Sequence, residues 1–378
     1  MINNFSCDIS LTNEQQAILQ GPSNIIVNGA AGTGKTMLAI LLAQKLSMQN
    51  KVGVIIYTKS LREFIRDTID NDAVTVFNPA WDDCIEQHYD YLIIDEVQDF
   101  TLATIKEILK IKFKGIYFFG DDSQQIYEWQ EKKVRIEDIQ RETGFKIVTL
   151  TQNMRLSTPV CLFLKSILPK FTFGNSTING IEILPDVEHF DSVAAEQDYI
   201  RRLVSDKMGG TIAVILRRNE QVKEYYEYLK KHVKTKPVGH KIKTTNNLIF
   251  KKNDSVNILT FHSAKGLEFD HVIIPDGGYD DEDGKCMYVG CTRARYSLII
   301  TDNGNGIYPI KPSELYNGKS HKNHMHSYEI RKKLLHVEEE LGRRNAFYHY
   351  CPTEYLKLQI EHLEVKKLEL VNELDKTK

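Results

Sequence analysis

The sequence predicts an α/β protein in which buried parallel strands alternate with helices, followed by a helical appendage at the C-terminus. Short apolar runs of strand length occur at residues 25–27, 52–57, 91–94 and 116–119, and runs of this kind suit strands that are covered on both faces. Residues 37–43 form a strong helix-forming segment between the first two runs. The length of 378 residues allows two packed domains plus an appendage, at roughly 100–200 residues per domain.

The composition is that of an ordinary soluble protein, with 42% hydrophobic and 26% charged residues. No stretch approaches the roughly 20 apolar residues of a membrane span, and residues 1–10 lack a signal-peptide core, so we expect a cytoplasmic protein without membrane contact. The net charge of −2 excludes a protein that coats nucleic acid by bulk charge, although it leaves room for a local basic groove. The six cysteines include no Cys-x2-Cys pair, which favours buried thiols over disulfides or zinc.

The strongest motif follows the first apolar run and has the phosphate-binding pattern Gly-x4-Gly-Lys-[Ser/Thr]. Its residues are Gly29, Ala30, Ala31, Gly32, Thr33, Gly34, Lys35 and Thr36. A strand, a glycine loop and a helix N-terminus present backbone N–H groups to phosphates, with the lysine reaching the β and γ oxygens and the last hydroxyl reaching Mg²⁺. The motif therefore predicts ATP and Mg²⁺ as cofactors.

Acidic and polar residues follow two later strands at their carboxyl ends, where open parallel sheets bind ligands. Asp95 and Glu96 come directly after the run at 91–94, and we expect Asp95 to hold Mg²⁺ and Glu96 to orient or deprotonate the attacking water. Polar residues after the run at 116–119 are placed to sense the γ-phosphate. Tyr127 and Trp129 lie a few residues further on, where a partner can stack.

In this order the segments resemble the superfamily 1 helicases of the UvrD/Rep/PcrA type, from residue 11 to about residue 301. In the first half the resemblance implies an adenine contact for Gln15, a single-strand contact for Thr58 and Lys59, a γ-phosphate contact for Gln124, and base stacking for Tyr127 and Trp129. It also implies a fold of two RecA-like P-loop domains, which we place at residues 1–150 and 151–302.

The second half carries three further motifs of that family. The segment Gln-Asn-Met-Arg implies that Arg155 reaches across the cleft to the γ-phosphate, and Cys-Thr-Arg-Ala implies that Arg293 is an arginine finger. In the string at 256–270 the resemblance implies that His262 faces DNA, that Gly266 lets the backbone approach the nucleotide, and that Glu268 contacts the ribose.

The chain departs from the family in two respects. It is shorter, and two of the positions that contact adenine hold other residues. Only about 32 residues separate Thr58 from Tyr91, and about 104 separate Arg155 from Thr260, so neither interval has room for the family's inserted subdomains 1B and 2B. Where relatives sandwich adenine between an arginine and a tyrosine, this chain has Met37 and Met154, which predicts weaker discrimination among nucleotides.

A lysine-rich segment, residues 230–252, lies where 2B would be inserted. We interpret it as a solvated loop, with a nucleic-acid contact that partly replaces the missing subdomain as the alternative.

Residues 303–378 form a linker and an appendage with predicted helices at 328–342 and 352–376. Leucine and isoleucine recur near 4-3 spacing in the second helix, and such a seam either docks on the protein's own body or binds a partner chain. Short UvrD-like proteins occur beside nucleases in anti-phage systems such as Gabija. The resemblance therefore suggests a protein partner such as a nuclease, bound through residues 318–378.

Two functions from different classes follow from these observations. The first is a DNA-dependent ATPase that translocates 3′ to 5′ on single strands, with weak unwinding. The second is a nucleotide-gated regulatory subunit that senses DNA and controls a partner; the missing subdomains favour it, whereas the intact catalytic residues favour the motor. RNA stays open as the bound strand, because backbone and stacking contacts discriminate poorly between the two nucleic acids.

Overall fold

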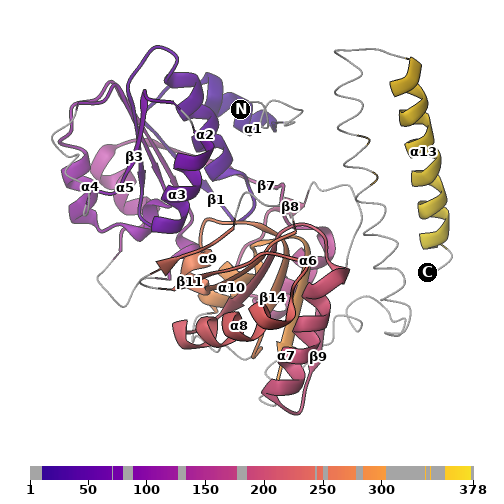
Figure 1. Ribbon diagram of the computed structural model, residues 1–378. Helices are drawn as coiled ribbons and strands as arrows, with labels where there is room; N and C mark the ends of the chain where they lie inside the picture. The colour runs from indigo at the N-terminus through magenta and orange to yellow at the C-terminus, as the bar shows by residue number, and fades with distance from the viewer. Residues whose placement is uncertain are drawn as a thin grey trace.

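In the computed structural model the chain forms two α/β lobes, with one long helix, α13 (Glu354–Asp375), to one side of both (Figure 1). The structure describes residues 11–69, 71–79, 88–126, 133–176, 185–242, 245–249, 254–277, 284–303, 337, 341 and 354–375. The predicted fold class, two RecA-like α/β units, is confirmed. Within these residues, no helix is long and apolar enough to cross a membrane.

The first lobe is built on a parallel six-stranded sheet with the strand order β3-β2-β4-β5-β1-β6. Its strands are β1 (Ile25–Gly29), β2 (Val52–Ile56), β3 (Val74–Phe77), β4 (Tyr91–Asp95), β5 (Gly115–Gly120) and β6 (Lys146–Leu150). Val27 of β1 lies between Phe119 of β5 and Val148 of β6. The central strands are mainly apolar because helices cover both faces of the sheet, and the polar residues Asn28 and Asp95 lie near their carboxyl ends.

The helices of the first lobe are α1 (Asn13–Gln20), α2 (Lys35–Leu46), α3 (Lys59–Thr68), α4 (Leu102–Ile108) and α5 (Ile136–Thr143), with short 3₁₀ helices η2 (Val97–Asp99) and η3 (Asp122–Gln124). The first three pack on the face that carries Val27, and α4 and α5 pack on the face that carries Ile26. Neighbouring residues of one strand thus belong to opposite cores, as the two-residue period of a strand requires.

The second lobe has a seven-stranded sheet with the order β12-β11-β13-β10-β14-β15-β9, parallel except where β12 pairs with β11. Its strands are β9 (Asp186–His189), β10 (Ile212–Leu216), β11 (Val238–Ile242), β12 (Thr245–Asn246), β13 (Val256–Thr260), β14 (Phe269–Ile274) and β15 (Ala294–Asp302). Helices α6 (Thr158–Ile167), α9 (Phe261–Ala264) and α10 (Lys285–Cys291) cover one face. The other face is covered by α7 (Val193–Arg202), the π-helical turn η4 (Leu203–Lys207) and α8 (Asn219–His232).

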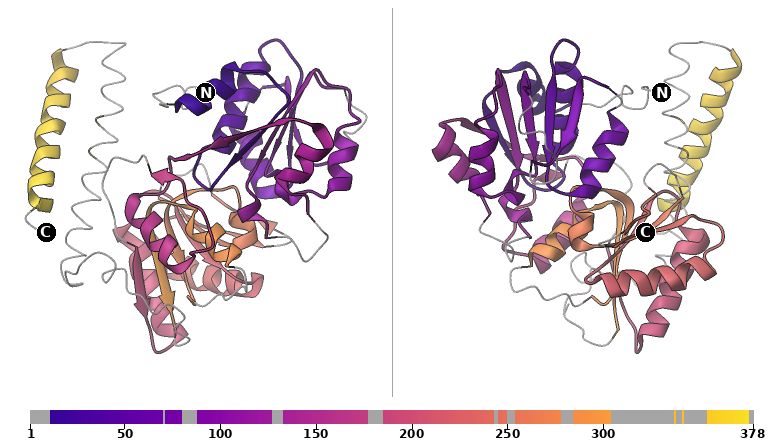
Figure 2. Two further views of the ribbon diagram at one scale, coloured as in Figure 1. Left: turned by 180° about the vertical axis from the view of Figure 1, so that it is seen from behind. Right: turned by 60° about the vertical axis from the view of Figure 1, so that its left-hand side comes forward.

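A small ribbon, β7 (Gln152–Asn153) paired with β8 (Asn175–Ser176), lies between the two lobes (Figures 1 and 2). It is tied to the phosphate-loop segment, because Asn153 Nδ2 donates to the Ala31 carbonyl at 2.9 Å and Met154 N donates to the Gly32 carbonyl at 2.8 Å. The Asn153 amide oxygen also accepts from the backbone N–H groups of Arg155 and Leu156. The segment that carries Arg155 is therefore positioned by the phosphate loop itself.

The apolar stripe of α13 is partly covered by the chain's own appendage. Ile360 and Leu370 are buried in one cluster with Val337 and Leu341. Helix α13 agrees with the helix predicted at 352–376, whereas most of the helix predicted at 328–342 lies outside the described residues. These contacts lie within the appendage, so docking on the two lobes and binding of a partner chain both stay predictions for the rest of the stripe.

The interpretation of residues 230–252 as a solvated loop holds only in part for the described part of that segment, in which Lys230, Lys231 and Lys234 are exposed. It contains the end of α8 and the strands β11 and β12. Lys236 and Lys241 are 9% and 8% exposed, and the Lys236 ammonium bonds to the Met208 carbonyl. The long aliphatic part of a lysine side chain allows such residues to pack against a sheet. The high lysine content of the segment gave no indication of this packing.

Candidate active site

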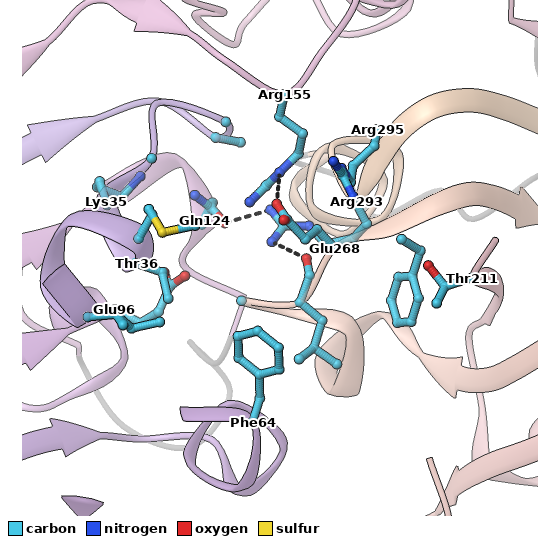
Figure 3. A pocket seen from close by; sticks show the side chains of 18 of the residues that line it. Lys35, Thr36, Phe64, Glu96, Gln124, Arg155, Thr211, Glu268, Arg293 and Arg295 are labelled. Atoms are coloured by element: carbon cyan, nitrogen blue, oxygen red, sulfur yellow. Dashed lines mark hydrogen bonds and ion pairs between the residues drawn. The ribbon is translucent and has the colours of Figure 1, made fainter. Parts of the chain in front are cut away.

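A cavity of about 310 Å³ lies between the lobes, and each lobe supplies one wall (Figure 3). Lys35, Thr36, Glu96 and Gln124 come from the first lobe, and Arg155, Glu268, Arg293 and Arg295 come from the second. Charged and polar side chains predicted from segments more than 250 residues apart therefore line one space. Arg155 and Arg293 both line the same cavity as Lys35.

The phosphate loop owes its shape to two glycines with left-handed backbone, Gly32 (φ 84°) and Gly34 (φ 81°). A Cβ on Gly32 would lie 2.5 Å from Asn153 Oδ1, and one on Gly34 would lie 2.7 Å from Gln15 Nε2. Helix α2 begins directly after the loop. The N–H groups of its first turn therefore lie at the cavity, which is the arrangement by which helix N-termini bind anions. Lys35 Nζ donates to the carbonyls of Gly29 at 2.6 Å and Ala30 at 3.1 Å, and burial lowers its pKa.

The residues predicted to hold Mg²⁺ are paired beneath the loop. Thr36 Oγ1 donates to Asp95 Oδ2 at 2.6 Å, and the Asp95 side chain is fully buried. Burial and the neighbouring Glu96 charge raise the pKa of Asp95 to about 7. A hydroxyl beside a carboxylate is a hard oxygen donor set, and the described residues hold no group of three or more His, Cys, Asp or Glu that would form a closed metal cage. This pair fits Mg²⁺, which binds through one or two protein oxygens together with phosphates and water.

Glu96 is a buried residue with left-handed backbone, at φ 53° and ψ 44°. Such a conformation costs a non-glycine residue free energy and is typical of functional sites. Gln98 Nε2 donates to Glu96 Oε2 at 2.5 Å, which fixes the carboxylate. Burial alone would raise the pKa of Glu96, but the positive charges of Lys265, Lys35 and Arg293 outweigh burial and lower it. The carboxylate is thus kept charged, as a group that orients or deprotonates water needs to be.

Gln124 links the two walls of the cavity. Its Nε2 donates to Asp121 Oδ2 at 2.8 Å within the first lobe, and its Oε1 accepts from Arg293 Nη2 at 3.0 Å across the cleft. The amide is therefore oriented by both lobes together.

The two arginines are held mainly by second-lobe groups. Arg293 is 2% exposed and donates to the carbonyls of Val289 at 2.8 Å and Leu267 at 3.2 Å; burial and the nearby Arg155 charge lower its pKa to about 10, which leaves it charged near neutral pH. Arg155 Nε donates to Glu268 Oε2 at 2.9 Å, drawn in Figure 3, and its Nη1 donates to the Thr292 carbonyl at 3.2 Å.

Two residues that join the lobes were missed by the sequence analysis. Lys265 is fully buried; its ammonium bonds to the Asp99 carboxylate and the Gln124 carbonyl and lies 3.9 Å from Glu96 Oε2. The Tyr288 hydroxyl accepts from Ala31 N at 3.0 Å and donates to Asp121 Oδ2 at 3.3 Å. The sequence did contain a signal for both residues. Each is a polar residue among apolar or small neighbours in the sequence, and a polar group that is buried there needs a hydrogen-bonding partner.

A second cavity, of about 350 Å³, adjoins the first and shares Gly32, Gly34, Met37, Arg155, Glu268 and Arg295 with it. Its other lining residues include Gln15, Met154 and Tyr296, so the three predicted adenine contacts, Gln15, Met37 and Met154, do come together. Gln15 Nε2 donates to the Thr33 carbonyl at 3.0 Å and to Met154 Sδ at 3.3 Å, and its Oε1 accepts from Thr12 N at 3.0 Å. Most of the hydrogen-bonding capacity of that amide is already used.

Two expectations drawn from the string at 256–270 need correction or extension. Gly266 lines the first cavity with φ 77°, but a Cβ there would lie 2.6 Å from Leu61 Cδ2, so the glycine permits close approach of the first lobe rather than of a nucleotide alone. Glu268, expected at the ribose, lines both cavities and is paired with Arg155.

The residues predicted to contact nucleic acid are only partly described. Thr58 is buried at the start of α3, whereas the Lys59 side chain is 65% exposed and lies 3.8 Å from Glu63. His262 is half-buried, and its Nε2 lies 3.3 Å from the Ile126 carbonyl. Tyr127 and Trp129 follow directly after Ile126 but lie outside the described residues. Their predicted role in base stacking stays a prediction.

The fold and the cavity define the class of protein: a two-lobed P-loop nucleotide-binding protein whose second lobe supplies arginines. Comparison with known families agrees, because residues 14–130 match an AAA domain and residues 240–305 match the UvrD-like helicase C-terminal domain. These two matches support the resemblance to the UvrD-like helicases of superfamily 1 that the motifs carry.

Individual relatives are similar over part of the chain. A DNA helicase II from Rickettsia typhi is 26% identical over 174 residues, and a probable DNA helicase II homolog from Rickettsia felis is 27% identical over 173 residues. Each match covers 42% of this chain and 26% of the relative, so the chain spans about a quarter of the length of these proteins. Among solved structures, the C-terminal domain of a possible DNA helicase from Lactobacillus plantarum WCFS1 is 25% identical, with a TM-score of 0.32, over 40% of this chain and 88% of that one.

Proposed function

We propose that the protein hydrolyses ATP to ADP and phosphate and uses the cycle to translocate 3′ to 5′ on single-stranded DNA, with weak unwinding on its own. The observation that carries the proposal is the single cavity that has Lys35, Thr36 and Glu96 on one wall and Arg155 and Arg293 on the other. A triphosphate in this cavity would contact cations from both lobes at once.

Each residue of the two walls has a distinct task in this proposal. The loop N–H groups and Lys35 bind the phosphates, while Thr36 and Asp95 would hold Mg²⁺, which supplies charge neutralisation at the phosphate oxygens. Glu96, fixed by Gln98, orients the attacking water and accepts its proton. Arg155 and Arg293 stabilise the charge that develops on the transferred phosphoryl group, in an enclosed site where such contacts are strong.

Nucleotide-dependent movement follows from the way the second wall is held. Arg293 bonds to Gln124 across the cleft, and Arg155 is paired with Glu268. A γ-phosphate would offer both guanidinium groups a stronger, doubly charged partner, and hydrolysis would remove it. Repeated closing and opening of the lobes over a strand stacked on Tyr127 and Trp129 would move the protein along that strand.

The nucleoside preference is expected to be loose. Gln15 has one free lone pair on Oε1, because both its amide hydrogens and its other lone pair are engaged. One acceptor position favours the amino group of adenine, but only weakly.

A second candidate function, the nucleotide-gated regulatory subunit, is favoured by one observation. The described residues between Thr58 and Tyr91 hold only α3 and β3, and those between Arg155 and Thr260 hold no subdomain beyond the elements of the second sheet, its helices and β8. The two functions differ in one measurement, the arrival time of the protein at the 5′ end of fluorescently labelled oligonucleotides. A motor arrives later on longer strands, whereas a sensor gives no dependence on length.

The catalytic assignment is tested by Glu96→Gln in the full chain. We expect kcat for ATP to fall by about 10²–10⁴-fold while ATP still binds, because only the water-activating charge is lost. Glu107→Gln, at an exposed glutamate on α4, is the matched control and should change neither quantity. Undiminished hydrolysis by the Glu96 variant would refute the role given to this residue.

A further inference from the structure

Tyr296 is a tyrosine of the second lobe that no motif assigned to the nucleotide. It lies on β15, three residues after Arg293, and lines the second cavity together with Gln15, Met37 and Met154. The residue is half-buried. It is the one aromatic residue among those that line this cavity within the described parts of the chain.

Arg295, beside it, connects the two cavities. Its guanidinium lies 5.1 Å from the centre of the Tyr296 ring, a distance typical of a cation–π pair, and its Nη1 donates to Asp270 Oδ1 at 3.2 Å. Arg295 lines both cavities, and Figure 3 shows it next to the Arg155–Glu268 pair. Arg295 therefore lies where the two cavities adjoin, and Tyr296 lies on the side of the second cavity.

We propose that Tyr296, together with Arg295, forms the second-lobe side of the nucleoside site, so that a nucleobase packs between this ring and the thioethers of Met37 and Met154. An aromatic ring beside a guanidinium gives a purine face the stacking partner that two methionines alone lack. The phosphates would remain in the adjoining cavity. This inference rests on the proposed function, because it assumes that the nucleotide occupies both cavities.

The arrangement has a consequence for specificity and for coupling. Stacking accepts any base with a π-face, so Tyr296 adds affinity for the nucleoside with little selection among bases. Because Gln15 and Met37 belong to the first lobe and Tyr296 to the second, the base would also help to hold the lobes together. Nucleoside and γ-phosphate would then bridge the cleft at two separate places.

The test compares MgATP with magnesium tripolyphosphate, which carries the phosphates but no nucleoside, by calorimetric titration of the full-length protein. Tyr296→Ala is expected to weaken ATP binding roughly tenfold, the loss of about one stacking contact, and to leave tripolyphosphate binding unchanged. Tyr296→Phe should bind both ligands as the wild type does, because it keeps the ring.

Tyr226→Ala is a closely matched control. Tyr226 is also half-buried in the second lobe, contacts a histidine ring at 4.1 Å and has Lys230 Nζ 4.8 Å from its ring centre, but it lines neither cavity. This control should bind both ligands normally.

The possible outcomes distinguish a failure of this inference from a failure of the proposed function. Normal ATP binding by Tyr296→Ala would overturn the inference, and so would an equal loss of ATP and tripolyphosphate, which would indicate a role in lobe packing. If the wild type binds neither ligand, the proposed function fails, and the inference fails with it.

Discussion

The two walls of the inter-lobe cavity are built on different principles. On the first-lobe wall, Lys35 and Thr36 are set by the glycine loop and the start of α2, and Lys35 Nζ donates to the neutral carbonyls of Gly29 and Ala30. On the second-lobe wall, Arg155 has an anionic partner, Glu268, and Arg293 has a partner across the cleft, Gln124. A phosphate can replace these partners, so the first wall is suited to binding and the second to sensing whether the γ-phosphate is present.

The largest expected effect comes from removing a sensing residue while the binding wall stays intact. Arg293→Ala should lower kcat for ATP by about 10³–10⁵-fold, the range for an arginine that stabilises a phosphoryl transition state. ATP affinity, measured by equilibrium titration, should change far less than kcat. Arg141→Ala, at a side chain 76% exposed on α5, is the control. If ATP affinity fell as much as kcat, Arg293 would serve binding too, and the two walls would not differ in function.

A second prediction concerns Lys265, whose buried ammonium joins the walls. Lys265→Met should destabilise the protein by about 3 kcal/mol, because it leaves the Asp99 carboxylate buried without its partner. Burial and the Glu96 charge already raise the pKa of Asp99 to about 7, so protonation of Asp99 would reduce the loss of stability. Thermal unfolding followed by circular dichroism measures the effect.

The control for this experiment is a surface ion pair. Lys110→Met removes the pair with Glu107, whose side chains are 70% and 55% exposed, and it should cost less than about 1 kcal/mol. Equal effects of the two substitutions would show that Lys265 does not join the lobes energetically.

The smallest effect is expected at the nucleoside. Because Met37 and Met154 replace the usual cation and ring, and because Gln15 offers a single free acceptor position, kcat/KM for ATP should exceed that for GTP by less than about tenfold, or 1.4 kcal/mol. Steady-state hydrolysis of both nucleotides measures the ratio. A strict preference for ATP would mean that contacts other than these select the base.

How much of the site was predictable depended on the distance between partners in the sequence. The phosphate loop and the Asp95–Glu96 pair were predictable because each motif is local and its spacing fixes its geometry. The family motifs placed Arg155 and Arg293 at the cleft, and the structure puts both there. A link to anti-phage defence stays a prediction.

The remainder depended on contacts that no local pattern contains. Lys265 meets Asp99 across 166 positions, and Tyr288 meets Ala31 across 257. The lysine content of residues 230–252 likewise gave the wrong environment for Lys236 and Lys241, because sheet packing decided their burial. The pairing of Glu268 with Arg155, 113 positions away, was also beyond the reach of spacing arguments.

The most direct test of the sensing wall is the distance between the lobes in different nucleotide states. Spin labels at Met48, 81% exposed in the first lobe, and Lys223, exposed on α8 of the second, allow that distance to be measured by double electron–electron resonance. The distribution should be shorter and narrower with a non-hydrolysable ATP analogue than with ADP, and Arg155→Ala combined with Arg293→Ala should abolish the difference. Identical distributions with the two nucleotides in the wild type would contradict the account.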